Sequence, residues 1–306
     1  MIQVNNVTKS FDQFRALDGV NMHVEKGDIY GLVGPIGAGK STIIRHLTGV
    51  YKQDAGEIFV DGEPIWENTK VKSKIAYIPD ELFYFMQADT MEMMRYYKGI
   101  YPQFDEEKFR RMQEFFPTID VKRNIRRLSK GMQKQVAFWL AICCNPEIMI
   151  LDEPVDGLDP VMRRQIWTIL MAEVEEKNLT VLVSSHNLSK LGDVCDHEGI
   201  MNKGKVMIER SLLELQGYIS KIQVACETGT PRLPEGFEVL HMANTGRVYT
   251  LIVRGNPKEA VESIMTDAGK PVVVDALPLT LEEIFIYEMG GVDYEVKDIL
   301  FNQDNF

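Results

Sequence analysis

The hydrophobic positions in the first part of the chain alternate between strand spacing and helix spacing. Three continuous apolar runs, typical of strands buried on both faces, lie at Ile29–Val33, Ile148–Leu151 and Thr180–Ser184. Further runs with strand character lie at Ile2–Val7, Gly19–Val24, Glu57–Val60 and Ile75–Ile78. This alternation predicts an α/β fold with a mainly parallel sheet covered by helices.

The character of the sequence changes at about residue 81, where strand patterns stop. Apolar residues recur at helical spacing over Met91–Tyr101 and Asp105–Phe116, and no strand pattern separates the two runs. We therefore expect a helical insertion that forms a subdomain at about residues 81–145. A further helix, from about Val161 to Glu176, is expected between the last two buried strands.

The alternating pattern starts again after about residue 217. Strands are predicted at Ile219–Cys226, Arg247–Val253 and Val272–Val274. Helix starts are predicted at Asn256, a capping residue followed by Pro and Glu, and at Thr280–Glu283, which fits a capping box. We therefore expect two domains, at residues 1–217 and 218–306, of which the second is a small accessory α+β domain without a recognisable catalytic constellation.

Composition and charge narrow the classes of function. The chain has 306 residues and a formal net charge of −11, an acidic balance that argues against nucleic acid as the main partner. The longest uncharged apolar run, Val136–Cys144, is too short to span a bilayer, and no N-terminal signal pattern is visible. We therefore expect a cytoplasmic protein, so that any work at a membrane needs another chain to span it.

Residues 34–42 match the phosphate-binding loop pattern G-x-x-x-x-G-K-[ST], between a predicted strand and a helical run. Glycines in such a loop let backbone N–H groups approach phosphate oxygens; Lys40 can reach the β- and γ-phosphates, and the Ser41 hydroxyl can bind Mg²⁺. The candidate nucleotide-binding residues are Gly34, Pro35, Ile36, Gly37, Ala38, Gly39, Lys40, Ser41 and Thr42. The sequence therefore predicts binding of a nucleoside triphosphate.

Two carboxylates directly follow the apolar run Ile148–Leu151. Asp152 and Glu153 are expected beside the phosphate loop, because the preceding strand is buried within the same sheet. Asp152 would hold Mg²⁺, directly or through water, and Glu153 would be the general base that polarises the attacking water. The alternative is that both carboxylates only cap the next helix.

A second candidate anion site lies in Leu128–Gln133, which we call the signature segment. Ser129 and the backbone N–H of Gly131 stand at the start of an apolar helix, where an anion is favoured. Two phosphate sites in one small domain are redundant unless they serve different nucleotides. We therefore expect a head-to-tail dimer, in which each signature segment closes on the nucleotide of the other subunit.

The order of these motifs resembles that of the nucleotide-binding subunits of ATP-binding cassette (ABC) transporters, over about residues 1–217. The resemblance implies a P-loop NTPase core with an antiparallel β portion, ATP and Mg²⁺ as ligands, ATP hydrolysis, and a homodimer or heterodimer of such subunits. It also implies a separate transmembrane permease subunit, with this chain peripheral on the inner face of the membrane. The Leu-Ser-Lys-Gly-Met form is similar to that of bacterial ABC-2-type exporters whose ATPase is a separate polypeptide, which implies export.

The same resemblance implies roles for further residues. Phe11 would stack on adenine, with Phe14 as the alternative ring, although a place in the core would also explain either one. His186, at a strand end, would contact the γ-phosphate and position water. Contacts with the partner's ATP would come from Ser129, Lys130, Gly131, Met132 and Asp159.

The sequence departs from the family pattern at three places. Ile36 replaces the usual Asn of the phosphate loop, and Lys130 and Met132 replace Gly and Gln of the commoner signature Leu-Ser-Gly-Gly-Gln. Asp80 stands where the family has a Gln that senses Mg²⁺ and the membrane partner. Because a carboxylate can bind Mg²⁺ more strongly than an amide oxygen, Asp80 joins Ser41 and Asp152 as a candidate metal ligand.

The segment Leu82–Met86, just after Asp80, is rich in large apolar groups. If exposed, it is the expected anchor for a transmembrane partner; the alternative is packing between the helical insertion and the core. A soluble ABC-type ATPase acting on ribosomes or DNA is the alternative function, and the single cassette, the lack of sustained heptads and the acidic charge disfavour it. A small-molecule P-loop kinase would not explain the signature segment.

Overall fold

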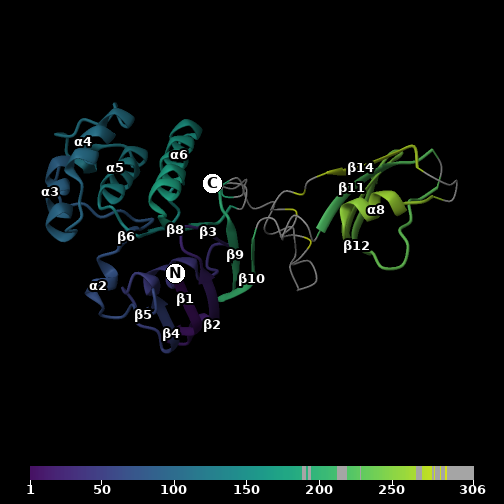
Figure 1. Cartoon of the computed structure of the whole chain (residues 1–306), viewed down its shortest axis with the longest axis horizontal. Helices are drawn as coiled ribbons and strands as arrows, with labels where there is room; N and C mark the ends of the chain where they lie inside the picture. Colours follow the sequence, from purple (N-terminus) through teal and green to yellow (C-terminus); the bar gives the residue numbers. More distant parts are fainter. Residues whose placement is uncertain are drawn as a thin grey trace. The chain divides into compact units, whose positions relative to one another are not determined.

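The computed structural model describes residues 1–187, 191, 194–211, 219–227, 229–266, 271–277, 279, 283 and 287 (Figure 1). The chain divides into two compact units: unit 1 comprises Met1–Asn187 and Val194–Glu209, and unit 2 comprises Leu188–Asp193 and Arg210–Phe306. The domain boundary expected after residue 217 lies outside the described residues, and so does the helix start expected at Thr280.

Unit 1 is built around a six-stranded sheet with the order β10-β9-β3-β8-β7-β6. Its strands are β3 (Ile29–Val33), β6 (Ile75–Ile78), β7 (Ile148–Leu151), β8 (Thr180–Ser185), β9 (His197–Asn202) and β10 (Lys205–Ser211). The pairs β6–β7, β7–β8, β8–β3 and β3–β9 are parallel, which confirms the predicted parallel sheet. Parallel neighbours bring their carboxyl ends to one edge, where α/β sheets bind their ligands.

A four-stranded antiparallel sheet with the order β2-β1-β4-β5 forms the second layer of unit 1. Its strands are β1 (Ile2–Phe11), β2 (Phe14–Val24), β4 (Ala55–Val60) and β5 (Glu63–Pro64). The turn between β4 and β5 contains Asp61 and Gly62, both with positive φ, as the Asp-Gly pair predicts.

Helix α1 (Lys40–Leu47) packs between the two sheets of unit 1. Its side chains Ile43, Ile44 and Leu47 are fully buried in one core cluster with residues of β1, β2, β3, β4, β7 and β8. Because this cluster involves strands of both layers, the start of α1 and the loop that precedes it are anchored from two sides.

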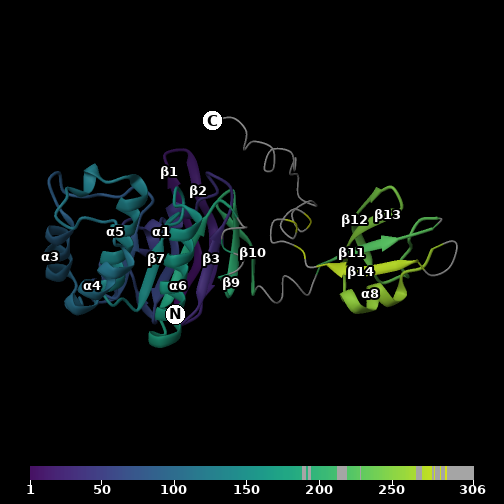
Figure 2. The ribbon, with the colours of Figure 1, turned by 90° about the horizontal axis from the view of Figure 1, so that it is seen from above.

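The remaining helices of unit 1 include the predicted helical insertion. The helices are α2 (Thr69–Lys72), α3 (Thr90–Ile100), α4 (Glu106–Met112), α5 (Lys130–Cys143) and α6 (Pro160–Lys177), with 3₁₀ turns η1 (Gln113–Phe115) and η2 (Ile125–Arg127). Helices α3, α4 and α5 group together in both views (Figures 1 and 2). The buried Trp139 of α5 stacks on Phe109 of α4, with ring centroids 4.5 Å apart, which joins two of these helices.

Unit 2 is a four-stranded antiparallel sheet with one described helix. Its strands, in the order β12-β13-β11-β14, are β11 (Ile219–Ala225), β12 (Glu238–Thr245), β13 (Val248–Arg254) and β14 (Val273–Leu277). Helix α8 (Pro257–Ser263) begins at the predicted cap Asn256, whose side chain accepts a hydrogen bond from Lys258 N. Ala260 of α8 and Ile264, which follows it, pack against residues of β11 and β13 in a small hydrophobic core.

The sequence pattern did not predict β9, β10 or β12. Strand β9 carries the buried Glu198 next to Gly199, so its apolar residues do not form a continuous run. Strand β12 is an edge strand whose side chains are almost all exposed, so burial imposes no alternation on it.

Candidate active site

The phosphate loop joins β3 to α1 and ends at Gly39, the N-cap of the helix. Gly37 and Gly39 have φ values of 82° and 107°, in the left-handed region that favours glycine. A Cβ added at Gly34 would lie 2.1 Å from the Met201 carbonyl oxygen, and one added at Gly39 would lie 2.9 Å from the Ala16 carbonyl oxygen. Only glycine therefore lets the backbone run this close, and the loop leads into a helix start that favours an anion.

Lys40 is buried at the base of the loop. Its Nζ donates to the carbonyl oxygens of Gly34 (2.7 Å) and Pro35 (3.2 Å) and lies 3.7 Å from Glu153 Oε1. Burial lowers the pKa of Lys40, and the neighbouring Glu153 and Asp152 carboxylates oppose this shift. The ammonium group thus stands between the loop and the acidic end of β7, where it can meet a bound phosphate.

Asp152, which follows β7, is almost fully buried. Its Oδ1 accepts hydrogen bonds from the hydroxyls of Ser41 (3.2 Å) and Ser184 (2.6 Å). A carboxylate and a hydroxyl in contact beside a phosphate site supply the oxygen ligands that Mg²⁺ prefers. The structure therefore brings together Ser41 and Asp152, two of the predicted metal ligands, and their donor atoms fit the ion.

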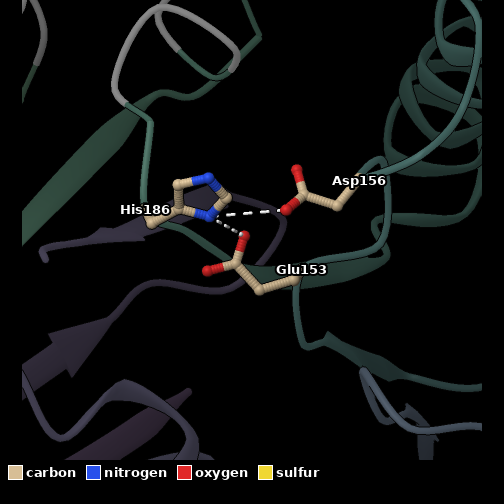
Figure 3. Close-up of side chains that lie close together, drawn as sticks. All are labelled: Glu153, Asp156 and His186. Atoms are coloured by element: carbon tan, nitrogen blue, oxygen red, sulfur yellow. Dashed lines mark hydrogen bonds and ion pairs between the residues drawn. The ribbon is translucent and has the colours of Figure 1, made fainter. Parts of the chain in front are cut away.

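Glu153, Asp156 and His186 form a cluster at the carboxyl ends of β7 and β8 (Figure 3). His186 Nδ1 lies 3.0 Å from Glu153 Oε2 and 3.4 Å from Asp156 Oδ2. The Glu153 N–H donates to Ser184 Oγ (3.0 Å), and Glu153 has a φ of 48°, a strained conformation for a residue with a side chain. The predicted base Glu153 and His186, the histidine predicted to contact the γ-phosphate, are thus in contact, and Asp156 joins them.

These groups line a cavity of about 460 Å³. Its walls are Phe14, Ala16, Ile36, Gly37, Ala38, Gly39, Lys40, Ser41, Thr42, Asp80, Glu153, Asp156 and His186. Phe14 is 66% exposed on this wall, whereas Phe11 packs edge-on against Tyr51, with ring centroids 5.5 Å apart. Of the two rings that the sequence offers for adenine, Phe14 thus lines the cavity and Phe11 does not.

The signature segment contributes none of the described residues that line this cavity. Ser129 is the N-cap of α5: its Oγ accepts a hydrogen bond from Met132 N at 3.2 Å, and both Ser129 and Lys130 are exposed. Asp159 is likewise exposed and caps α6 through two backbone hydrogen bonds of 3.0 Å to its Oδ1. Three of the residues predicted to contact a partner's ATP are thus exposed on their own chain, and the other two, Gly131 and Met132, are half-buried.

Asp80 lies on the cavity wall, as its predicted contact with bound metal requires. Its Oδ1 is 3.5 Å from Lys134 Nζ, and the same Nζ donates to the backbone carbonyl oxygen of Glu153 at 2.8 Å. Sequence reasoning missed Lys134, Ser184 and Asp156. The acidic side chain of Asp156, so close to Asp152 and Glu153, was a usable signal, whereas Lys134 and Ser184 carry none.

Comparison with known proteins identifies the family. The model of the ABC transporter family matches residues 17–156. The chain is 30% identical over 291 residues to the ABC transporter ATP-binding protein YtrB of Bacillus subtilis (strain 168), and the match covers 95% of this chain and 99% of that protein. The chain belongs to the ABC transporter ATP-binding proteins. The cassette is also 30% identical over 211 residues to the bacitracin transport ATP-binding protein BcrA of Bacillus licheniformis, covering 68% of this chain and 69% of that protein.

Solved cassettes share the fold. The ATP-binding subunit of an ABC transporter matches with a TM-score of 0.65 and 25% identity, covering 71% of this chain and 92% of that one. A dimeric bacterial ABC transporter cassette matches with a TM-score of 0.63 and 25% identity, covering 69% of this chain and 99% of that one. The chain is thus an ABC ATPase that binds and hydrolyses ATP with Mg²⁺. In the part of the chain that the structure describes, no helix has the length and apolar character to cross a membrane.

Proposed function

We propose that this ABC ATPase drives export through a separate transmembrane subunit, working at the inner face of the membrane. The observation that carries the proposal is an exposed group of large side chains that begins shortly after Asp80, a residue of the cavity wall. We call this group, Phe83, Phe85, Met86 and Tyr96, the aromatic patch. Export is supported by the likeness to BcrA, a bacitracin transport ATP-binding protein, and to YbhF of Escherichia coli (strain K12), a probable multidrug ABC transporter ATP-binding protein.

The exposure of the aromatic patch supports the anchor interpretation of Leu82–Met86 over the core interpretation. Phe83 is 72% exposed and Met86 76%, and Phe85 contacts both Phe83 and Tyr96 edge-on, with ring centroids 6.0 and 4.9 Å apart. Contiguous exposed aromatic groups of this kind mark protein interaction sites. The patch begins three residues after Asp80, so a partner bound to it acts close to the ATP cavity.

For hydrolysis we assign the roles from the contacts in the cavity. Lys40 and the loop N–H groups hold the phosphates. Ser41 and Asp152 would hold Mg²⁺, which would supply charge neutralisation for the phosphate oxygens. Asp80 would accept from a metal-bound water. Glu153 takes the proton of the attacking water, and His186, hydrogen-bonded to Glu153, positions that water against the γ-phosphate.

The second half of the site would come from another cassette, in a homodimer or a heterodimer. The residues that would complete it are Ser129, Lys130 and Asp159, which are exposed, and Gly131 and Met132, which are half-buried. Binding of two ATP molecules would close the dimer, and hydrolysis would open it again. The permease subunit would convert this cycle into transport.

The test replaces Phe83 and Phe85 by Ser in the full chain, co-expressed with a membrane subunit from a neighbouring gene. Co-sedimentation with membranes should fall at least tenfold, because buried aromatic anchors dominate interface energies, while ATP affinity persists. Phe115→Ser, at an aromatic 49% exposed in η1, is the matched control and should stay membrane-bound. Loss of ATP binding together with membrane association would support the core interpretation, and wild-type co-sedimentation with ribosomes instead of membranes would contradict the transporter assignment.

A further inference from the structure

Lys134 links helix α5, which starts within the signature segment, to the peptide of Glu153, the proposed base. Lys134 lies in the second turn of α5, whose N-cap is Ser129. Its Nζ donates to the Glu153 carbonyl oxygen at 2.8 Å and lies 3.5 Å from Asp80 Oδ1, and its side chain is only 14% exposed. None of the roles assigned above uses this group.

The backbone at Glu153 needs support from its surroundings. Its φ of 48° is one that a residue with a side chain holds only where neighbouring groups impose it. On one side, its N–H donates to Ser184 Oγ at 3.0 Å. On the other side, its carbonyl oxygen accepts from Lys134 Nζ at 2.8 Å and from Asp156 N at 3.4 Å. Lys134 thus provides the shorter bond to the carbonyl, and the one that is strengthened by a charge.

We propose that Lys134 is a positioning residue that holds the Glu153 peptide so that its carboxylate faces the bound nucleotide. The inference rests on the proposed action of two cassettes on two ATP molecules. Helix α5 would then contact the partner's ATP through Ser129 and the base of its own chain through Lys134. Docking of α5 on one nucleotide therefore bears directly on hydrolysis of the other.

Asp80 orients Lys134 in this arrangement. The Asp80 side chain is 56% exposed and the pair is 3.5 Å apart, so its electrostatic contribution is smaller than that of the hydrogen bond to Glu153. Asp80 also leads directly into Leu82–Met86 and the aromatic patch. A carboxylate at this position thus gives a membrane partner a path of contacts through Lys134 to the base.

The first test is Lys134→Met in the purified full chain, which keeps the length of the side chain and removes its charge. The kcat for ATP hydrolysis should fall about 10- to 100-fold, the effect of losing one charged hydrogen bond, while KM stays within about twofold. Lys134→Arg should restore most of the loss. Lys70→Met is the control: Lys70 pairs with Glu63 at the surface (2.6 Å), and kcat should not change.

A second measurement separates positioning from a merely structural role. Glu153→Gln and the double variant Glu153→Gln/Lys134→Met should form the ATP-bound dimer equally well by size-exclusion chromatography, because Lys134 acts on the base and not on the nucleotide. Loss of that dimer in the double variant, or an unchanged kcat for Lys134→Met, would overturn the inference. A wild-type chain without ATPase activity would instead contradict the proposed function.

The Asp80 link is tested by a double-mutant cycle. In the Lys134→Met background, Asp80→Asn should lower kcat by a smaller factor than it does in the wild type, since part of its effect is transmitted through Lys134. Losses that multiply would overturn the link from Asp80 and leave it only a direct contact with metal.

Discussion

The phosphate loop and the signature segment each lead into a helix N-terminus that can bind an anion, but the surroundings of the two helix starts differ. At the start of α1, Lys40 and Ser41 already contact the acidic end of β7, and the walls of the 460 Å³ cavity surround them. At the start of α5, Ser129 is exposed and its hydroxyl accepts a hydrogen bond from its own helix. The site at α1 is assembled within a single chain, whereas the start of α5 is an exposed surface without a second wall among the described residues that line the cavity.

A helix N-terminus becomes a binding site only when other elements complete it. At α1 the completion comes from the ends of β7 and β8, which supply the predicted metal ligand Asp152, the predicted base Glu153 and the histidine His186. At α5 we infer that the completion is the nucleotide held by another cassette. The comparison predicts that damage to the first site affects chemistry and nucleotide binding in one chain, whereas damage to the second weakens the dimer and leaves nucleotide binding by the single chain intact.

The largest effect is expected from Glu153→Gln. Turnover should fall by about 10²- to 10⁴-fold, the usual contribution of a general base, while an ATP-bound dimer accumulates. Phosphate release and size-exclusion chromatography measure the two effects. Glu147→Gln, at a half-exposed carboxylate just before β7, is the control. Normal hydrolysis in Glu153→Gln would remove Glu153 from the mechanism and break the first half of the comparison.

Lys40→Ala should weaken ATP binding by about 100-fold, because it removes a charged group that contacts the phosphates. Titration with a fluorescent ATP analogue measures the affinity. Lys98→Ala, at a half-exposed lysine of α3, should leave it unchanged. An unaltered affinity in the Lys40 variant would mean that backbone N–H groups alone hold the triphosphate.

Ser129→Arg tests the other half of the comparison. In the Glu153→Gln background, the ATP-bound dimer should weaken about 10- to 100-fold through loss of a hydrogen bond to a charged phosphate. Nucleotide affinity of the monomer should not change, because Ser129 does not line the cavity of its own chain. Sedimentation equilibrium measures the dimer. A dimer of undiminished strength would show that the signature segment is not part of the shared site.

The smallest effect concerns the adenine platform. Phe14→Ala should weaken ATP binding about 3- to 10-fold through loss of an aromatic contact, and Phe11→Ala should have less effect because its ring packs on Tyr51. Calorimetric titrations of both variants measure the difference. The reverse order would restore Phe11 to the place that the family resemblance implies.

Contiguous patterns were predictable from the sequence, and contacts between distant segments were not. The bounds of β3, β6 and β7 were predicted because strands buried on both faces are continuously apolar. The phosphate loop and the Asp152–Glu153 pair were found because their chemistry lies within one short segment. The contact of Lys134 with Glu153 joins a helix to a strand end through tertiary packing, which no periodicity encodes.

The burial of helix α1 affects how the cassette uses the energy of ATP binding. Displacing the phosphate loop would pull Ile43, Ile44 and Leu47 away from two layers of strands at once, at roughly 1.5–3 kcal/mol for each exposed side chain. The phosphate loop is therefore held rigidly, and little of the binding free energy of the triphosphate is spent on deforming the loop. The remaining binding free energy is then available to move one subunit against another. The burial of α1 between two sheets thus helps the cassette to convert the energy of ATP into movement.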